Sequence, residues 1–272
     1  MSKSRDWKKD LPEYLRELHL PAIRECFEEK ARQAERETLG YEHYLLELVE
    51  RECQKRRAHR ITRLLQVSKL PLEKTLENFD LKRLPVKAAR QMKALLDGSF
   101  LDRRENVLAF GNPGSGKTHL LSALGQEMIR QGRRVAFSTC VRLVQDLLRA
   151  KKDLHLSRAI KKLAYYEALV IDDIGYVQQS REEMEVLFTL LAERYERGSV
   201  LITSNLPFSK WEVIFKDPMT TASAIDRLVH HSVILELNIG SYRLDADSGR
   251  RRSRFRTDGD HRSEVMSITI PA

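Results

Sequence analysis

Gly111-Asn112-Pro113-Gly114-Ser115-Gly116-Lys117-Thr118 is the stretch that decides the fold, because it fits the pattern G-x-x-x-x-G-K-[ST] at every position. The glycines let the backbone turn its N–H groups inward, where they can surround a phosphate. Lys117 can reach the β- and γ-phosphates of ATP, and the Thr118 hydroxyl can ligate Mg²⁺. We therefore predict a nucleotide-binding loop over these residues and the adjoining His119.

The flanks of this loop support the prediction. Residues 106–110 form an apolar run that indicates a buried strand. A helix is expected from about Lys117 to Arg130, and its positive dipole end would face the anion. A glycine-rich turn with a chance Lys-Thr pair is the alternative, but it does not explain why strand, loop and helix occur in this order.

A second part of the site is predicted where a buried strand ends in two carboxylates, Asp172 and Asp173. A parallel sheet presents the carboxyl ends of its strands to the ligand. Asp172 would then lie beside Thr118 and hold Mg²⁺ through water, and Asp173 would orient or deprotonate the attacking water. A strand that simply ends in an Asp-Asp-Ile-Gly turn is the alternative, and the upstream loop makes it weak.

The remaining apolar runs complete an α/β domain. Strands are expected at residues 133–139, 199–205 and 232–237, with helices at 141–149, 181–197 and 221–228 between them. This alternation implies right-handed crossovers and a parallel sheet flanked by helices. Asn205, at the tip of its strand, could contact the γ-phosphate or the water, or it could begin the turn into Leu206-Pro207.

The first 75 residues carry only helical patterns, so we expect a small all-α N-terminal domain over residues 1–75. Pro12 and Pro21 are expected at breaks or helix starts, and Gly40 between two helices. These helices are too few for a large core of their own. In the connector that follows, Phe79 could wedge against an adenine, although a packing anchor is the more ordinary role.

The charge of the chain points to an acidic partner, with nucleic acid as the first candidate. Its 48 Lys and Arg against 39 Asp and Glu give a formal net charge of +9. A solvated basic surface is the alternative. The densest basic patch is a candidate contact with DNA phosphates, and its residues are Lys151, Lys152, Arg158, Lys161 and Lys162. An N-terminal basic run, residues 51–63, suits a solvated helix face equally well.

The sequence gives little support for a disulfide framework, a membrane span, a signal peptide or a metal site. Cys26, Cys53 and Cys140 lie far apart and suggest no disulfide framework, which favours a reducing cytoplasm. The sequence has no apolar run long enough to span a bilayer and no signal-peptide core. His230 and His231 are adjacent, without metal-ligand spacing, and are interpreted as ordinary helix-end residues. We expect a basic, disordered tail at residues 246–272.

Five motifs occur in an order that resembles one family: GNPGSGKTHL, ALVIDDIG, ITSNLPFSKW, AIDRLVHHS and SYR. The set is similar to the IstB-like helper ATPases of bacterial insertion sequences, relatives of the DnaC-like helicase loaders and of DnaA. The resemblance covers most of the chain, to about Arg243. The phosphate loop is shared with many families, whereas ITSNLPFSKW followed by DRL-x-H-H is much more specific.

The resemblance implies an AAA+ P-loop ATPase over residues 76–245 that self-associates into an oligomer, with ATP between subunits. It assigns Asn205 as the sensor-1 residue, Arg227 as the arginine finger acting on a neighbouring subunit, and Arg243 as a sensor-2-like contact. An Arg supplied by a neighbour neutralises charge in the transition state, so hydrolysis would depend on assembly. The implied partners are double-stranded DNA and a transposase.

The chain departs from the AAA+ pattern at one acidic position, and three alternative functions stay open. Many AAA+ proteins have Glu where this chain has Asp173, so slower hydrolysis is expected while nucleotide binding is kept. The same motifs would serve a DnaC-like loader that delivers a replicative helicase onto single-stranded DNA. A small-molecule P-loop kinase would need neither Asn205 nor an assembly-dependent Arg227. A DNA clamp that uses ATP only as a switch would show negligible turnover.

Overall fold

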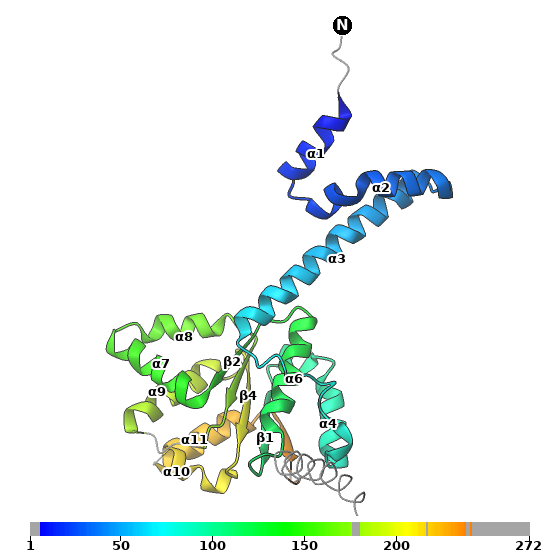
Figure 1. Ribbon diagram of the computed structural model, residues 1–272. Helices are drawn as coiled ribbons and strands as arrows, with labels where there is room; N and C mark the ends of the chain where they lie inside the picture. Colours follow the sequence, from blue (N-terminus) through cyan, green and yellow to red (C-terminus); the bar gives the residue numbers. More distant parts are fainter. Residues whose placement is uncertain (1–5, 176–179, 216, 238–239, 241–272) are drawn as a thin grey trace, which may run out of the picture. The chain divides into compact units, whose positions relative to one another are not determined.

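The computed structural model describes residues 6–175, 180–215, 217–237 and 240. The chain divides into two compact units, Met1–Val67 and Ser68–Ala272, and each is described by itself (Figure 1). Within the described residues, no helix has both the length and the apolar character needed to cross a membrane.

The first unit is helical and has a small core. It consists of α1 (Trp7–Glu17), α2 (Pro21–Glu37) and most of α3 (Tyr41–Ser68). Pro21 begins α2 and Gly40 separates α2 from α3, as predicted, whereas Pro12 lies inside α1 and marks neither a break nor a start. Among the described residues, its core cluster consists of five buried side chains: Leu15, Ile23, Cys26, Phe27 and Leu48.

A buried carboxylate ties α3 to the start of α2. The Glu52 side chain accepts hydrogen bonds from the backbone N–H groups of Ala22 (2.7 Å) and Ile23 (3.2 Å). It also pairs with Arg56 at 2.8 Å. Burial opposes the charge of this carboxylate most strongly, but Arg56 and the two N–H groups outweigh it, so the pKa of Glu52 is lowered. The free N–H groups at the start of α2 thereby find an acceptor.

The second unit is built on the predicted parallel sheet. Its strands are β1 (Asn106–Gly111), β2 (Val135–Thr139), β3 (Ala168–Asp172), β4 (Ser199–Ser204) and β5 (Ser232–Leu237). They lie in the order β2-β3-β4-β1-β5, and every neighbouring pair is parallel. The order places β1 and β3 on either side of β4, so the ends of the three strands that carry the predicted site are adjacent.

Helices cover both faces of the sheet, which confirms the predicted α/β class. One face is covered by α6 (Lys117–Arg130), which contacts β1 to β4. The opposite face packs against α7 (Cys140–Lys152), α9 (Arg181–Arg194) and α11 (Pro218–Val229), with Leu108, Leu169 and Ile202 in their shared core (Figure 1). The smaller elements are η1 (Leu81–Arg83), α4 (Val86–Leu95), α5 (Ser99–Asp102), α8 (Leu156–Ala164), η2 (Phe208–Lys210) and α10 (Glu212–Phe215).

Some boundaries differ from the prediction by one to three residues for identifiable reasons. β2 begins at Val135 rather than residue 133, because Gly132 turns the chain with φ +88° shortly before it. β3 ends at Asp172, because Asp173 takes a left-handed φ of +65°. α9 ends at Arg194 rather than residue 197, and Glu196 in the following turn has φ +56°.

Candidate functional site

The site lies at the carboxyl edge of the sheet, where three adjacent strands end. β1 runs into the glycine-rich loop, β3 ends at Asp172, and β4 ends at Ser204. Because all the strands are parallel, their last residues meet at one edge. The two predicted halves of the nucleotide site are therefore brought together by the strand order.

The backbone of the loop depends on its glycines. Gly114 and Gly116 have φ values of +80° and +88°, a region that residues with a Cβ rarely adopt. A Cβ on Gly111 would lie 2.4 Å from the carbonyl oxygen of Leu237 in β5. α6 begins directly after Gly116, so its free N–H groups and positive dipole end border the loop.

Two buried polar groups in the loop fit a phosphate. The Ser115 hydroxyl is buried, and no group within the described residues hydrogen-bonds to it. Lys117 is 9% exposed, and its ammonium donates to the carbonyl oxygens of Gly111 and Asn112 at 2.8 Å each. A buried polar atom without a partner is costly, and a phosphate oxygen would satisfy the Ser115 hydroxyl.

Four groups from three elements form a hydrogen-bonded chain behind the loop. The Thr118 hydroxyl donates to Asp172 Oδ1 at 2.7 Å. The Thr203 hydroxyl, from β4, donates to the same oxygen at 2.7 Å and accepts from the backbone N–H of Asp173 at 2.7 Å. The predicted pair Thr118 and Asp172 is thus in direct contact, and Thr203 fixes both acidic residues.

Thr203 is the residue that the sequence analysis missed. Its side chain is 2% exposed, although it belongs to a strand whose other buried residues are mostly apolar. A polar residue shortly before the end of a buried strand was the available signal, because such a side chain needs a partner. The partner could not be identified from sequence, since it lies on the neighbouring strand.

Asp173 occupies a position suited to proton chemistry. Burial raises the pKa of the Asp173 carboxyl, the neighbouring Asp172 raises it further, and Lys117 opposes the shift. Its left-handed backbone turns the chain directly after β3. A carboxyl with a raised pKa beside a nucleotide loop is a candidate proton acceptor.

Asn205 directly follows β4 and lies close to the turn after β3, and Ser204 makes the turn beside it. The Ser204 hydroxyl donates to the Leu206 carbonyl at 2.8 Å and accepts from its N–H at 3.1 Å. A Cβ on Gly175, in the turn after Asp173, would come within 2.7 Å of Asn205 Oδ1. That oxygen is buried, and within the part of the chain that the structure describes nothing hydrogen-bonds to it.

A cavity of about 210 Å³ adjoins the loop on the side of the connector. Phe79 is 5% exposed and packs edge-on against His119, with ring centroids 5.2 Å apart. The His119 Nε2 atom lies 2.7 Å from the carbonyl oxygen of Thr75. Phe79 is therefore a packing partner that also lines the cavity; the other lining residues are Lys74, Asn78, Gly114, Gly116, Lys117, Thr118 and His119.

Arg227 lies away from the loop, and Arg243 lies outside the described residues. Asn106, at the start of β1, donates its side-chain amide to the carbonyl of Leu228 at 3.1 Å, which anchors the end of α11 at the amino edge of the sheet. The Arg227 guanidinium lies over the Phe188 ring at 4.6 Å. Its Nη1 is buried without a hydrogen-bond partner among the described residues.

The predicted basic patch lies on α7 and α8, beside the β2 edge of the sheet (Figure 1). The apolar residues of α8 pack inward, so its basic residues face outward. Lys151 is half-buried and pairs with Glu185 of α9 at 2.9 Å. The other four are exposed: Lys152, Arg158, Lys161 and Lys162.

Sequence comparisons identify the relatives of the chain. Residues 13–249 match the family described as IstB-like ATP binding protein. An insertion sequence ATP-binding protein of Sinorhizobium fredii is 41% identical over 257 residues, covering 94% of this chain and 86% of the relative. The insertion sequence IS5376 ATP-binding protein of Geobacillus stearothermophilus is 37% identical over 237 residues, covering 87% of this chain and 94% of the relative.

Solved structures show the same fold at low identity. The DnaC helicase loader matches with a TM-score of 0.53 and 16% identity, covering 62% of this chain and 98% of the other. DnaA from Aquifex aeolicus, in its AMPPCP-bound form, matches with a TM-score of 0.53 and 20% identity, covering 73% of this chain and 58% of the other. These similarities show that the chain shares its fold with these two proteins.

Proposed function

The chain belongs to the family of IstB-like ATP binding proteins, and from this premise we propose that it is an ATP-dependent DNA-binding helper of transposition that assembles on duplex DNA. It is an ATPase of the AAA+ class. The named relatives belong to insertion sequences. The proposal adds that the protein requires Mg²⁺, binds DNA, forms an oligomer and has a transposase as its partner. It also assigns roles to individual residues.

The observation that carries the proposal is the contact between the Thr118 hydroxyl and Asp172 Oδ1, 2.7 Å apart, directly after loop residues 111–117. A hydroxyl and a carboxylate are oxygen donors of the kind that Mg²⁺ prefers, and they face the place where the phosphates would lie. When bound, Mg²⁺ would neutralise phosphate charge between them. Lys117 and the loop N–H groups would hold the nucleotide, with its base toward the cavity beside Phe79.

We assign the acceptance of the water's proton to Asp173 and the positioning of that water to Asn205. Asp173 would accept the proton of the attacking water, because burial and Asp172 make its carboxyl more basic than an ordinary aspartate. The Asn205 oxygen has no hydrogen-bond partner among the described residues; Asn205 directly follows the end of β4, and its oxygen would hold that water in place. Both assignments use side chains that have few other interactions in the described chain.

Arg227 would act on a neighbouring subunit. The six residues of β1 separate the loop from the amino edge, and the five steps between them span about 17 Å at ~3.3 Å per residue. The end of α11 is anchored at that amino edge, and the guanidinium is directed to Phe188 rather than to its own loop. An Arg placed in this way would complete the site of a neighbouring subunit, which would make hydrolysis depend on assembly.

We assign duplex DNA to the outward face of α8 and the end of α7. Lys152, Arg158, Lys161 and Lys162 are exposed and can neutralise backbone phosphates without reading sequence. Lys151 would contribute less, because it already pairs with Glu185. The net charge of +9 favours the same partner. The N-terminal domain would contact the transposase or neighbouring subunits, and the free cysteines agree with a cytoplasmic location.

The helicase loader is the second candidate function, because the second unit shares its fold with the DnaC helicase loader. The two functions differ in the DNA that they use and in their partner. A P-loop kinase would show ATP turnover that is independent of protein concentration, and a DNA clamp would show almost none.

The experiment compares wild type with Lys117→Ala in a duplex-binding assay with and without ATP and Mg²⁺. We expect ATP to promote binding by wild type, and we expect no ATP-dependent binding by the variant. Retention of the transposase of the same insertion sequence on the wild-type complex would identify the partner. Full ATP-dependent DNA binding by Lys117→Ala would overturn the proposal.

A further inference from the structure

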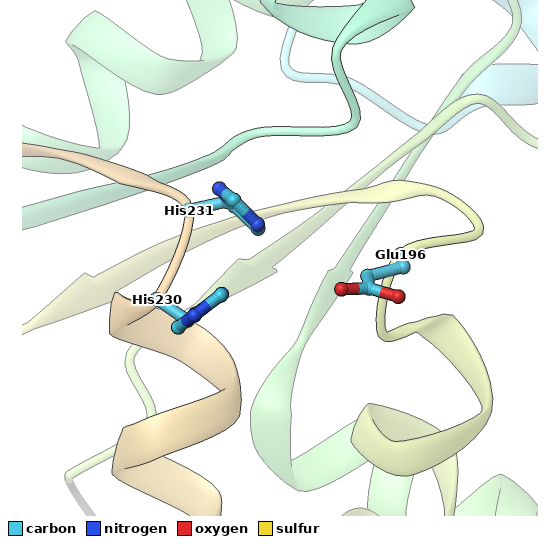
Figure 2. Close-up of side chains that lie close together, drawn as sticks. All are labelled: Glu196, His230 and His231. Atoms are coloured by element: carbon cyan, nitrogen blue, oxygen red, sulfur yellow. The ribbon is translucent and has the colours of Figure 1, made fainter.

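We propose that Glu196, His230 and His231 form a binding site for a divalent transition-metal ion of the zinc class, separate from the nucleotide site. Each of the three side chains offers one ligand atom, and these atoms lie within 4.8 Å of one another. Figure 2 shows the carboxylate of Glu196 opposite the two imidazole rings. The ligand set is two nitrogens and one oxygen.

The strand order brings these residues together. Glu196 lies in the turn between α9 and β4, whereas His230 and His231 join α11 to β5. β4 and β5 flank β1, so their starts are two strand spacings apart, about 10 Å. Side chains from the two turns close that gap at the amino edge of the sheet, at the other end of β1 from the nucleotide loop.

Asn106 holds both halves of the site in place. Its side-chain oxygen accepts from the N–H of Val200 in β4 at 2.9 Å, and its amide donates to Leu228 of α11 at 3.1 Å. Its backbone N–H donates to the carbonyl of His231 at 2.7 Å. The Arg104 guanidinium donates to the Glu196 carbonyl. The backbones that carry the three ligands are therefore fixed to each other, which lowers the cost of ordering the site on binding.

Only small side-chain movements are needed for coordination. With metal–ligand bonds of about 2.1 Å and tetrahedral angles, ligand atoms lie about 3.4 Å apart. The ring centroids of His230 and His231 already lie 4.3 Å apart, with an angle of 82° between the ring planes. The Tyr195 hydroxyl lies 3.5 Å from Nδ1 of His230. Three exposed side chains leave the remaining coordination position open to water or to a partner's group.

The donor set selects the metal. Imidazole nitrogens with one carboxylate suit Zn²⁺, Co²⁺ or Ni²⁺, whereas Mg²⁺ prefers an octahedron of oxygens and keeps its own water. The Mg²⁺ used with ATP would therefore not compete for this site. A bound ion would clamp the turn before β4 to the end of α11, three residues after Arg227.

The test is zinc titration of tag-free protein that carries Cys53→Ser, because Cys53 is an exposed thiol that would bind the same metals. We expect one Zn²⁺ per chain, no displacement by excess Mg²⁺, and a visible absorption band when Co²⁺ is used instead. Saturating Zn²⁺ should raise the melting temperature by several degrees.

Three variants locate the site. Glu196→Gln should weaken zinc binding at least tenfold, and the double variant His230→Ala/His231→Ala should abolish it. His59→Ala is the matched control, because His59 is an exposed histidine outside any such cluster in the described chain. Circular dichroism without metal checks that each variant is folded. Absence of zinc binding, or equal binding by all variants, would overturn the proposal.

Discussion

Replacing Thr203 by Val tests whether the hydrogen-bonded chain behind the loop organises the nucleotide site. The substitution keeps the size and branching of the side chain and removes only the hydroxyl. That hydroxyl makes two bonds of 2.7 Å, one to the Asp172 carboxylate and one from the Asp173 N–H. Thr203 is 2% exposed, so water cannot replace either bond without rearrangement.

The expected magnitude follows from those two bonds. A hydrogen bond to a charged group contributes about 1.5–3 kcal/mol and a neutral one about 0.5–1.5 kcal/mol. The free energy of unfolding of the second unit should therefore fall by about 2–4.5 kcal/mol. Asp172 also loses one of the donors that orient it, and losing an outer partner of a metal ligand costs roughly 10–100-fold in metal affinity or activity.

Two assays measure these effects separately. ATP hydrolysis is titrated with Mg²⁺, and we expect the half-saturating Mg²⁺ concentration to rise about 10–100-fold. Urea unfolding is followed by the fluorescence of Trp211, which is fully buried in the second unit. Thr203→Ser is the control, because it keeps the hydroxyl and should stay close to wild type. A Thr203→Val protein with wild-type Mg²⁺ dependence and stability would refute the reasoning.

Three further predictions concern other parts of the second unit. Arg194 is 3% exposed and donates to the carbonyls of four residues, so Arg194→Met should lower the free energy of unfolding by about 3 kcal/mol or more in urea. The pKa of Asp173 is raised in the folded chain, so its ionisation costs stability as pH rises through the interval between its ordinary and raised pKa values. Asp173→Asn should therefore melt higher than wild type at pH 7, lose this advantage near about pH 3, and hydrolyse no ATP; a lower melting temperature at pH 7 would contradict the sign. Arg227→Ala and Lys117→Ala should each be inactive alone, but their mixture should regain ATP turnover. In the mixture, the Arg227→Ala subunit supplies an intact nucleotide site and the Lys117→Ala subunit supplies the arginine. A mixture with no more activity than the separate variants would exclude action between subunits.

The parts of the fold that depend on local patterns were predictable. β5 has the predicted bounds, Ser232–Leu237, because Val233, Ile234 and Leu235 form an apolar run at its centre. The arrangement of strand, glycine-rich loop and helix was predictable as well, since eight consecutive residues carry its pattern. Boundaries set by single backbone angles, such as the end of β3 before Asp173, were less accurate.

Contacts between strands were not predictable to the same degree. Thr203 meets Asp172 only because β4 lies beside β3, and a single sequence does not give that order. Glu196 lies near His230 and His231 for a similar reason. The two histidines were interpreted as helix-end residues, and His230 does follow the last residue of α11. Glu196, the third residue of the cluster, is more than 30 residues away in sequence, so no local spacing could reveal it.

The central claim is ATP-dependent assembly on duplex DNA, and the most direct measurement sizes the protein–DNA complexes formed on duplex and on single-stranded DNA. Each DNA is tested with and without ATP and Mg²⁺. We predict large complexes on duplex DNA that form only when ATP and Mg²⁺ are present. Preference for single strands would support the helicase loader, and absence of DNA binding in every condition would contradict the account.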